Sequence, residues 1–372
     1  MRAFEEQNPD IRVDIITIPF VEFWEKLPVM YSTGTLPDVL LTISSYYVQQ
    51  WIREGAYLSL EPFIAREDPS FRADFVPGSL DAYSYRGEVY GLPYDVSVPT
   101  LYINLNAFDQ AGLARPLTDE WTLEDMLEAA KRLTRRPGAG PAERVGLATN
   151  RFYWIDNYWS FWGARAFDTD LTRSTLDDPR AAEALQWWAD LSLVHQVTPL
   201  SGDPAIFANG NIGMYPADST EISQLRSAAS FDWDVTYMPK GPGGGRGIFL
   251  GGGFAIGSQT RHPEEAWQLL KHLVSTETLA AAVAYPGRSV PGRTSAARLL
   301  LEQPAPPANI RIIVEELERG LVEPAPSNPY YFDFQRIVQP HIDRVFSGQT
   351  DARTALQAAV VQLNAMLAEK AQ

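Results

Sequence analysis

Leu101-Tyr102-Ile103-Asn104 and Gly253-Phe254-Ala255-Ile256 are two short runs that each predict a buried β-strand, because apolar side chains dominate both. Helical patterns lie on either side of them, for example at residues 23–32 and 263–273. The same alternation of strands and helices continues along the whole chain. It therefore predicts the α/β fold class.

Helix starts further along the chain can be placed from their capping residues. Thr122-Leu123-Glu124-Asp125 has the pattern of a capping box, and Asp178 stands before Pro179, which suits the first helical position. A last helix is predicted from about residue 351 to residue 368, where leucine and valine recur at helical spacing.

Near the start, the alternating Ile11, Val13 and Ile15 predict a strand, and the apolar run at residues 37–41 predicts a second one. A helix at residues 23–32 lies between them. Strand, helix and strand in this order are the unit of a doubly wound sheet, so we expect the two strands to run parallel, with both faces covered.

Length and composition narrow the functional classes. A chain of 372 residues is long enough for two compact lobes. Its formal net charge of −15 makes nucleic acid and anionic membrane surfaces poor partners. The absence of cysteine excludes disulfides and thiolate chemistry, and the four histidines have no zinc-binding spacing, so no metal site and no cofactor are expected.

The beginning of the chain has no secretory signal, since Met1-Arg2-Ala3-Phe4 leads directly into polar residues. Two interpretations follow: a cytoplasmic protein, or a mature or trimmed form of an exported one.

Several stretches, in this order, resemble the extracellular solute-binding proteins of sugar ABC transporters, the maltodextrin-binding type. The stretches are Phe4…Asn8-Pro9-Asp10-Ile11, Pro37-Asp38-Val39, Tyr90-Gly91-Leu92-Pro93-Tyr94-Asp95, Leu101-Tyr102-Ile103-Asn104…Phe108…Ala111-Gly112-Leu113, Trp121-Thr122, Phe207…Gly210-Asn211-Ile212-Gly213-Met214, Gly252-Gly253-Phe254-Ala255-Ile256 and Pro263-Glu264-Glu265-Ala266-Trp267. Each is weak alone, but together they cover nearly the whole chain.

The resemblance implies a two-lobed periplasmic-binding-protein-like α/β fold with a hinge and an interlobe ligand cleft. Residues 1–103 plus 256–293 would form the N-terminal lobe, and residues 107–253 plus 294–372 the C-terminal lobe. Such proteins usually open with a strand before the helix that ends at Phe4…Asn8, so we expect that first strand to be missing here.

A sugar binder needs flat aromatic platforms and polar groups at their edges. The resemblance places Trp154 or Tyr158, from the aromatic stretch 151–162, in the cleft, and it implies Tyr215 as a platform with Asp218 as a hydroxyl acceptor. Core packing is the alternative for the stretch 151–162, because Trp154, Tyr158, Phe161 and Trp162 recur at helical spacing, and helix capping is the alternative for Asp218.

Further candidate ligand-binding residues come from loops near the two crossing strands. The glycines would let backbone N–H groups approach a ligand closely, and an arginine would donate two hydrogen bonds to neighbouring hydroxyls. A plain loop and a surface salt bridge are the respective alternatives. These candidates are Ser44, Tyr46, Asp95, Gly251, Gly252, Gly253, Arg288 and Tyr330.

The predicted function is capture of a mono- or oligosaccharide by lobe closure and delivery to membrane permease subunits, by a monomeric, non-catalytic protein. The location would be periplasmic or extracellular, with a lipoprotein anchor as one form. Alternative ligands are a glycerophosphodiester, a polyamine and, from the Tyr330-Tyr331 pair, ferric ion. A carbohydrate-active enzyme with two catalytic carboxylates is the rival class.

Overall fold

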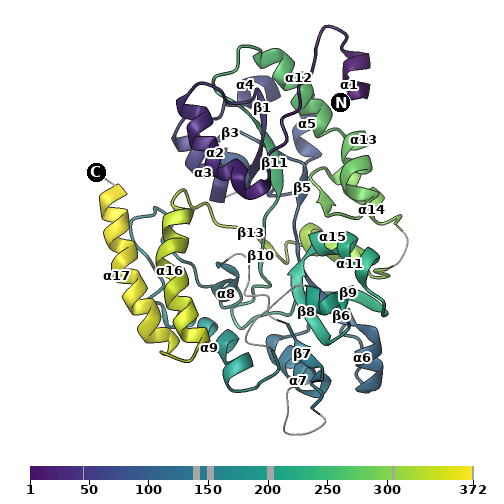
Figure 1. Ribbon diagram of the computed structural model, residues 1–372, viewed down its shortest axis with the longest axis vertical. Helices are drawn as coiled ribbons and strands as arrows, with labels where there is room; N and C mark the ends of the chain where they lie inside the picture. The colour runs from purple at the N-terminus through teal and green to yellow at the C-terminus, as the bar shows by residue number, and fades with distance from the viewer. Residues whose placement is uncertain (45, 137–142, 149–154, 199–204, 304–305, 371–372) are drawn as a thin grey trace.

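Two small β-sheets form the centres of two lobes in the computed structural model (Figure 1). The structure describes residues 1–370 except 45, 137–142, 149–154, 199–204 and 304–305. One lobe contains most of the first hundred residues together with a later segment that returns to it, and the other lobe contains most of the remaining chain (Figure 1).

The sheet of the first lobe has the strand order β1-β11-β4 and is antiparallel throughout. Its strands are β1 (Val39–Ile43), β11 (Gly252–Ile256) and β4 (Leu92–Pro93). The central strand β11 therefore comes from a part of the sequence more than 150 residues beyond its neighbours. The helices on this side are α1 (Arg2–Gln7), α2 (Phe20–Ser32), α3 (Tyr46–Arg53), α4 (Glu61–Ile64), α5 (Pro69–Ala73), α12 (Pro263–Leu273) and α13 (Thr276–Leu279). The next helix, α14 (Thr294–Leu300), packs through Ala297 and Leu300 into a core that contains β8.

The sheet of the second lobe has the order β7-β8-β6-β9. Its strands are β7 (Val145–Leu147), β8 (Ile212–Asp218), β6 (Pro99–Asn104) and β9 (Trp233–Thr236); β6 is antiparallel to β8 and β9, and β7 is parallel to β8. The helices on this side are α6 (Leu105–Gln110), α7 (Leu123–Leu133), α8 (Asn157–Ser160), α9 (Pro179–Leu193), α10 (Ala205–Ala208), α11 (Ile222–Ala228), α15 (Arg311–Glu318), α16 (Tyr331–Phe346) and α17 (Ala352–Lys370).

Short strand pairs complete the fold. They are β2 (Ser84–Tyr85) with β3 (Glu88–Val89), β5 (Asp95–Val96) with β12 (Val290–Pro291), and β10 (Ile248–Phe249) with β13 (Glu323–Pro324). Single turns of tighter or wider helix occur at Asp81–Tyr83, Ser219–Glu221 and Ala280–Ala284. None of the described helices has the length and apolar character needed to cross a bilayer.

The helix starts predicted from capping residues are confirmed. Thr122 accepts the amide of Asp125 while the Asp125 carboxylate accepts the amide of Thr122, which is a complete capping box at the start of α7. The Asp178 carboxylate accepts the amide of Arg180 at the start of α9. These side chains satisfy amides that have no partner within their helix.

Two predictions for the first lobe are wrong. Residues 11–19 form no strand, and Ile15 is 69% exposed, because no described strand lies beside this segment to pair with it. The strand predicted at residues 37–41 is β1, but it runs antiparallel to β11 rather than parallel to a strand near the N-terminus. Alternation predicts an extended segment, whereas pairing depends on a partner elsewhere in the chain.

Candidate ligand-binding site

Two chain segments cross side by side between the lobes. The first leaves β4, passes through β5 and enters β6; the second leaves β10 and enters β11. Ser97 and Leu250 join them midway, with the Ser97 amide 2.7 Å from the Leu250 carbonyl oxygen and the Leu250 amide 3.2 Å from that of Ser97. This junction is where candidate residues from both lobes meet.

Asp95 lies on the first crossing segment and is 4% exposed. The Gly252 amide donates a 2.6 Å hydrogen bond to its Oδ1 atom. Burial raises the pKa of Asp95 to about 6, although the Gly252 hydrogen bond and the charge of Arg288 act in the opposite direction.

Asp218 ends β8 and lies opposite Pro99 on β6. Its side chain caps no helix, and no residue in the described part of the chain donates a hydrogen bond to its carboxylate. Burial, together with the neighbouring charges of Glu221 and Asp95, raises the pKa of Asp218 to about 7. A partly exposed carboxylate without a donor is therefore placed beside a second carboxylate at the lobe junction.

The three predicted glycines lie close to the junction, and the amides of two of them already have acceptors there. The Gly251 amide donates to Ser44 Oγ (3.0 Å), and the Gly252 amide donates to Asp95. Gly253 lies within β11, between Thr42 and Pro93. The amides of Gly251 and Gly252 therefore already have acceptors within the protein, and ligand contact by the three glycines stays a prediction.

A tyrosine that the sequence reasoning missed explains why residue 252 is glycine. A Cβ atom there would stand 2.4 Å from the ring of Tyr94. The centroid of that ring is 5.3 Å from the centroid of Phe254 and 5.8 Å from the central carbon of the Arg288 guanidinium. Burial raises the pKa of Tyr94 far above its ordinary value. The signal was present, since Tyr94 directly precedes Asp95 in the quoted motif.

Arg288 is exposed and, within the described part of the chain, has no carboxylate at salt-bridge distance. The surface salt bridge considered as its alternative role is therefore not formed there. Ser44 is 2% exposed and is held at the junction by two hydrogen bonds to the Gly251 backbone, one through its hydroxyl and one through its amide.

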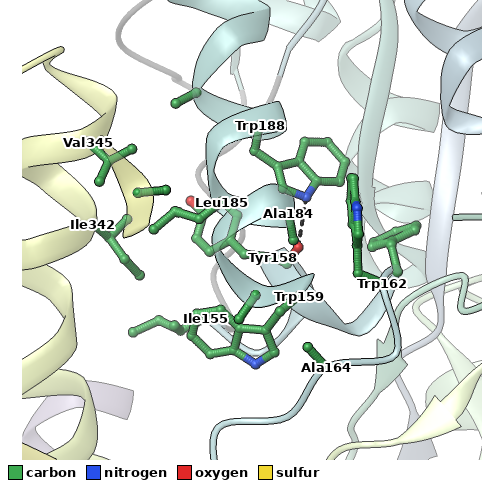
Figure 2. Packing of buried hydrophobic residues seen from close by; sticks show 14 of the residues in the cluster. Ile155, Tyr158, Trp159, Trp162, Ala164, Ala184, Leu185, Trp188, Ile342 and Val345 are labelled. Carbon is green, nitrogen blue, oxygen red and sulfur yellow. Dashed lines mark hydrogen bonds between the residues drawn. The ribbon is translucent and has the colours of Figure 1, made fainter. Parts of the chain in front are cut away.

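Two of the predicted aromatic platforms lie in hydrophobic cores instead. Tyr158 is 2% exposed, and the Nε1 of Trp188 donates a 2.9 Å hydrogen bond to its backbone carbonyl (Figure 2). Tyr215 is 1% exposed and stacks on Phe207, with centroids 5.4 Å apart. Both placements correct the prediction, because each ring packs into a hydrophobic core.

The structure describes the other three aromatic candidates to different extents. Trp154 lies outside the described residues, and Tyr46 begins α3 with its side chain likewise undescribed. Tyr330 precedes α16 and is half-buried, and its hydroxyl accepts a 2.7 Å hydrogen bond from Arg53 Nη1 at the end of α3. Tyr330 thus lies at the contact between the two lobes.

A surface hollow of about 420 Å³ lies elsewhere, at the far end of β6. It is lined by residues that include Asn104, Gln110, Arg144 and Phe231. The candidate site is at the Pro99 end of the same strand, so the two are separated by the length of β6. Among the described residues, no group of three or more His, Asp or Glu side chains is arranged to hold a metal ion.

Two lobes joined by crossing strands, with acidic and aromatic side chains at their junction, are the architecture of a two-lobed solute-binding protein. The chain belongs to the bacterial extracellular solute-binding proteins, since that family's model matches residues 1–308.

A putative binding protein of Brucella abortus is 25% identical over 280 residues, which is 73% of this chain and 66% of that protein. The chain therefore matches slightly less than two thirds of that relative's length.

Two solved structures share the fold. An ABC substrate-binding protein of Listeria monocytogenes, in complex with cycloalternan, has a TM-score of 0.85 at 24% identity, covering 99% of this chain and 94% of that one. UgpB of Mycobacterium tuberculosis, in complex with glycerophosphocholine, has a TM-score of 0.85 at 20% identity, covering 100% and 94%.

Proposed function

We propose that this protein captures a mono- or oligosaccharide between its lobes and delivers it to the permease of an ABC transporter. The observation that carries the proposal is the Asp218 carboxylate, which receives no hydrogen bond from the described residues and lies near Asp95 at the junction. A partly buried acceptor without a donor is costly unless a ligand supplies one.

Sugar hydroxyls are donors of the required kind. Hydrogen bonds to a charged group contribute about 1.5–3 kcal/mol each. A sugar hydroxyl that donates to an ionised Asp218 would therefore add that much to the binding free energy. The rings of Tyr94 and Tyr330 would supply apolar surface for the C–H faces of a sugar. The fold neighbour from Listeria, solved with cycloalternan, supports the same ligand class.

A glycerophosphodiester is the second candidate, and one observation favours it. Arg288 is exposed beside Tyr94 with no described carboxylate at salt-bridge distance, so its guanidinium could bind a phosphate. The fold neighbour from Mycobacterium tuberculosis was solved with glycerophosphocholine. Three carboxylates at the junction, Asp95, Asp218 and Glu221, weigh against an anionic ligand.

We also propose how the chain is divided into lobes and where the protein acts. The N-terminal lobe would comprise about residues 1–103 plus 256–293 and the C-terminal lobe residues 107–253 plus 294–372. The two separate sheets, β1-β11-β4 and β7-β8-β6-β9, support a division into two lobes, although β6 begins in the second sheet at Pro99 and β11 begins in the first at Gly252. The protein would act as a monomer outside the cytoplasmic membrane, with a lipoprotein anchor as one form, and would catalyse no reaction.

A thermal-shift screen tests the proposal, because a ligand that binds only the native state raises the melting temperature. The panel contains maltotriose, mannitol, glycerophosphocholine and spermidine, each with wild type and Asp218→Asn. Stabilisation by a sugar that weakens in D218N supports sugar capture. Stabilisation by glycerophosphocholine alone transfers the assignment to the second candidate, and hydrolysis of a labelled oligosaccharide would move the protein to the enzyme class.

A further inference from the structure

Arg53 and Tyr330 join the two lobes although 277 positions separate them in sequence. Arg53 is the last residue of α3, and Tyr330 stands directly before α16. The Arg53 Nη1 atom donates to the Tyr330 hydroxyl oxygen at 2.7 Å, and the guanidinium carbon lies 4.9 Å from the centroid of the same ring. One side chain thus contacts both the face and the hydroxyl of the other.

The Tyr330 ring is held firmly from its own lobe. The Oδ1 atom of Asn328, which is 2% exposed, accepts the Tyr330 amide at 3.0 Å. The next residue, Tyr331, is 2% exposed in the core of the second lobe, and Tyr330 itself packs against that core. The ring is therefore a fixed surface that the first lobe approaches.

Other residues of the first lobe contact the second lobe as well. Trp24 of α2 and Ile43 of β1 both pack against the hydrophobic core that contains α16 and α17. In Figure 1 the N-terminal end of α16 points toward α2 and α3. The Arg53–Tyr330 pair is thus the polar part of a wider junction between lobes.

The contact is strong enough to shift the equilibrium between open and closed lobes. Arg53 is exposed, and a cation–π contact at an exposed site changes an equilibrium constant by about two- to fivefold. Such a contact is too weak to lock the lobes, but it changes the fraction of molecules that are closed before a ligand arrives. A ligand that needs the closed state then binds more tightly in proportion to that fraction.

We propose that Arg53 is a positioning residue of the binding site: through its contact with the Tyr330 platform it favours closure of the unliganded lobes. The inference rests on the proposed function for its consequence, which is a gain in ligand affinity. The contact and its effect on the lobes can be measured without any ligand, so the two proposals can fail separately.

The experiment measures the distance between the lobes. Because the chain contains no cysteine, Val29→Cys on α2 and Val361→Cys on α17 introduce the only thiols, at side chains that are 59% and 71% exposed. Spin labels at these positions report the interlobe distance distribution by pulsed electron spin resonance. We expect Arg53→Ala to lower the ratio of closed to open molecules by about two- to fivefold, with Arg53→Lys restoring part of it.

Two further variants separate a lobe contact from a general effect. Arg86 lies 5.2 Å above the ring of Tyr85 within the first lobe, so Arg86→Ala removes a similar contact without touching the junction and should leave the distribution unchanged. Tyr330→Phe removes the hydroxyl acceptor and should add nothing further in the Arg53→Ala background. An unchanged distribution in R53A, an equal shift in R86A, or additive effects of R53A and Y330F would each overturn the inference.

Discussion

The Gly252 amide is 2.6 Å from Oδ1 of Asp95, which ties the strand that returns to the first lobe to the strand that leaves it. The two residues are 157 positions apart. Because Asp95 is 4% exposed, its carboxylate has exchanged water for this backbone donor. Asp95 therefore has two roles at the junction: it holds the two strands together, and it contributes a carboxylate.

Asp95→Ala is expected to destabilise the protein more than Asp95→Asn. Asparagine keeps an oxygen for the Gly252 amide, whereas alanine leaves that buried donor unsatisfied, at a cost of about 1–3 kcal/mol. Urea unfolding of both variants at pH 7 measures the difference. Equal stability of the two variants would show that water replaces the lost acceptor.

Glu316 on α15 predicts that stability falls at high pH. Its side chain is fully buried, its Oε1 accepts the Met238 amide at 2.9 Å, and its Oε2 has no described partner. Burial raises its pKa to about 8. A carboxyl with a raised pKa stabilises the fold fully below its ordinary value of 4.5, and this contribution is lost as the pH rises through 8.

Glu316→Gln should therefore gain stability relative to wild type progressively as the pH rises from about 5 to 8, by about 1.4 kcal/mol per pH unit and a few kcal/mol in total, and should keep that gain at pH 9. Melting temperatures across pH 5–9 provide the measurement. Glu318→Gln is the matched control, because it changes an exposed carboxylate of the same helix. Parallel pH profiles for wild type and E316Q would contradict the assignment.

Asp218 predicts that sugar affinity rises with pH. Its pKa of about 7 means that the carboxyl is mostly neutral at pH 5.5 and mostly ionised at pH 8. Hydroxyl donors favour the ionised form, so binding should lower this pKa and affinity should increase as the pH rises through 7. Calorimetric titration at these two pH values, with a sugar that stabilises wild type, should show the increase. D218N should show a smaller increase, because Asp95, with a pKa of about 6, still titrates at the junction in this range.

The fold class and the helix starts could be predicted because their signals are local. A capping box such as Thr122 with Asp125 is formed by residues three apart, and its geometry follows from the helix alone. The pairing of β1 with β11 could not be predicted in the same way, since it joins segments about 210 residues apart. Local periodicity carries no information about such a partner.

The candidate site was predicted in part. Asp95, Asp218 and Ser44 are near the junction, because residues beside crossing strands must lie there. Tyr158 and Tyr215 are core residues, and sequence alone could not separate the roles, since an aromatic ring suits a core and a sugar platform equally.

The two buried tyrosines give the last prediction. Truncating a large aromatic side chain in a packed core costs about 3–5 kcal/mol, so Tyr158→Ala and Tyr215→Ala should each lose about that much stability. Tyr158→Phe keeps the ring in the cluster of Figure 2 and should cost under about 1.5 kcal/mol. Phe332→Ala is the control for an exposed aromatic residue of similar size, since Phe332 is 41% exposed.

Urea unfolding gives the stabilities, and calorimetry on the folded fraction gives the sugar affinity. Weakened binding with unchanged stability in Y158A or Y215A would return that residue to the ligand site.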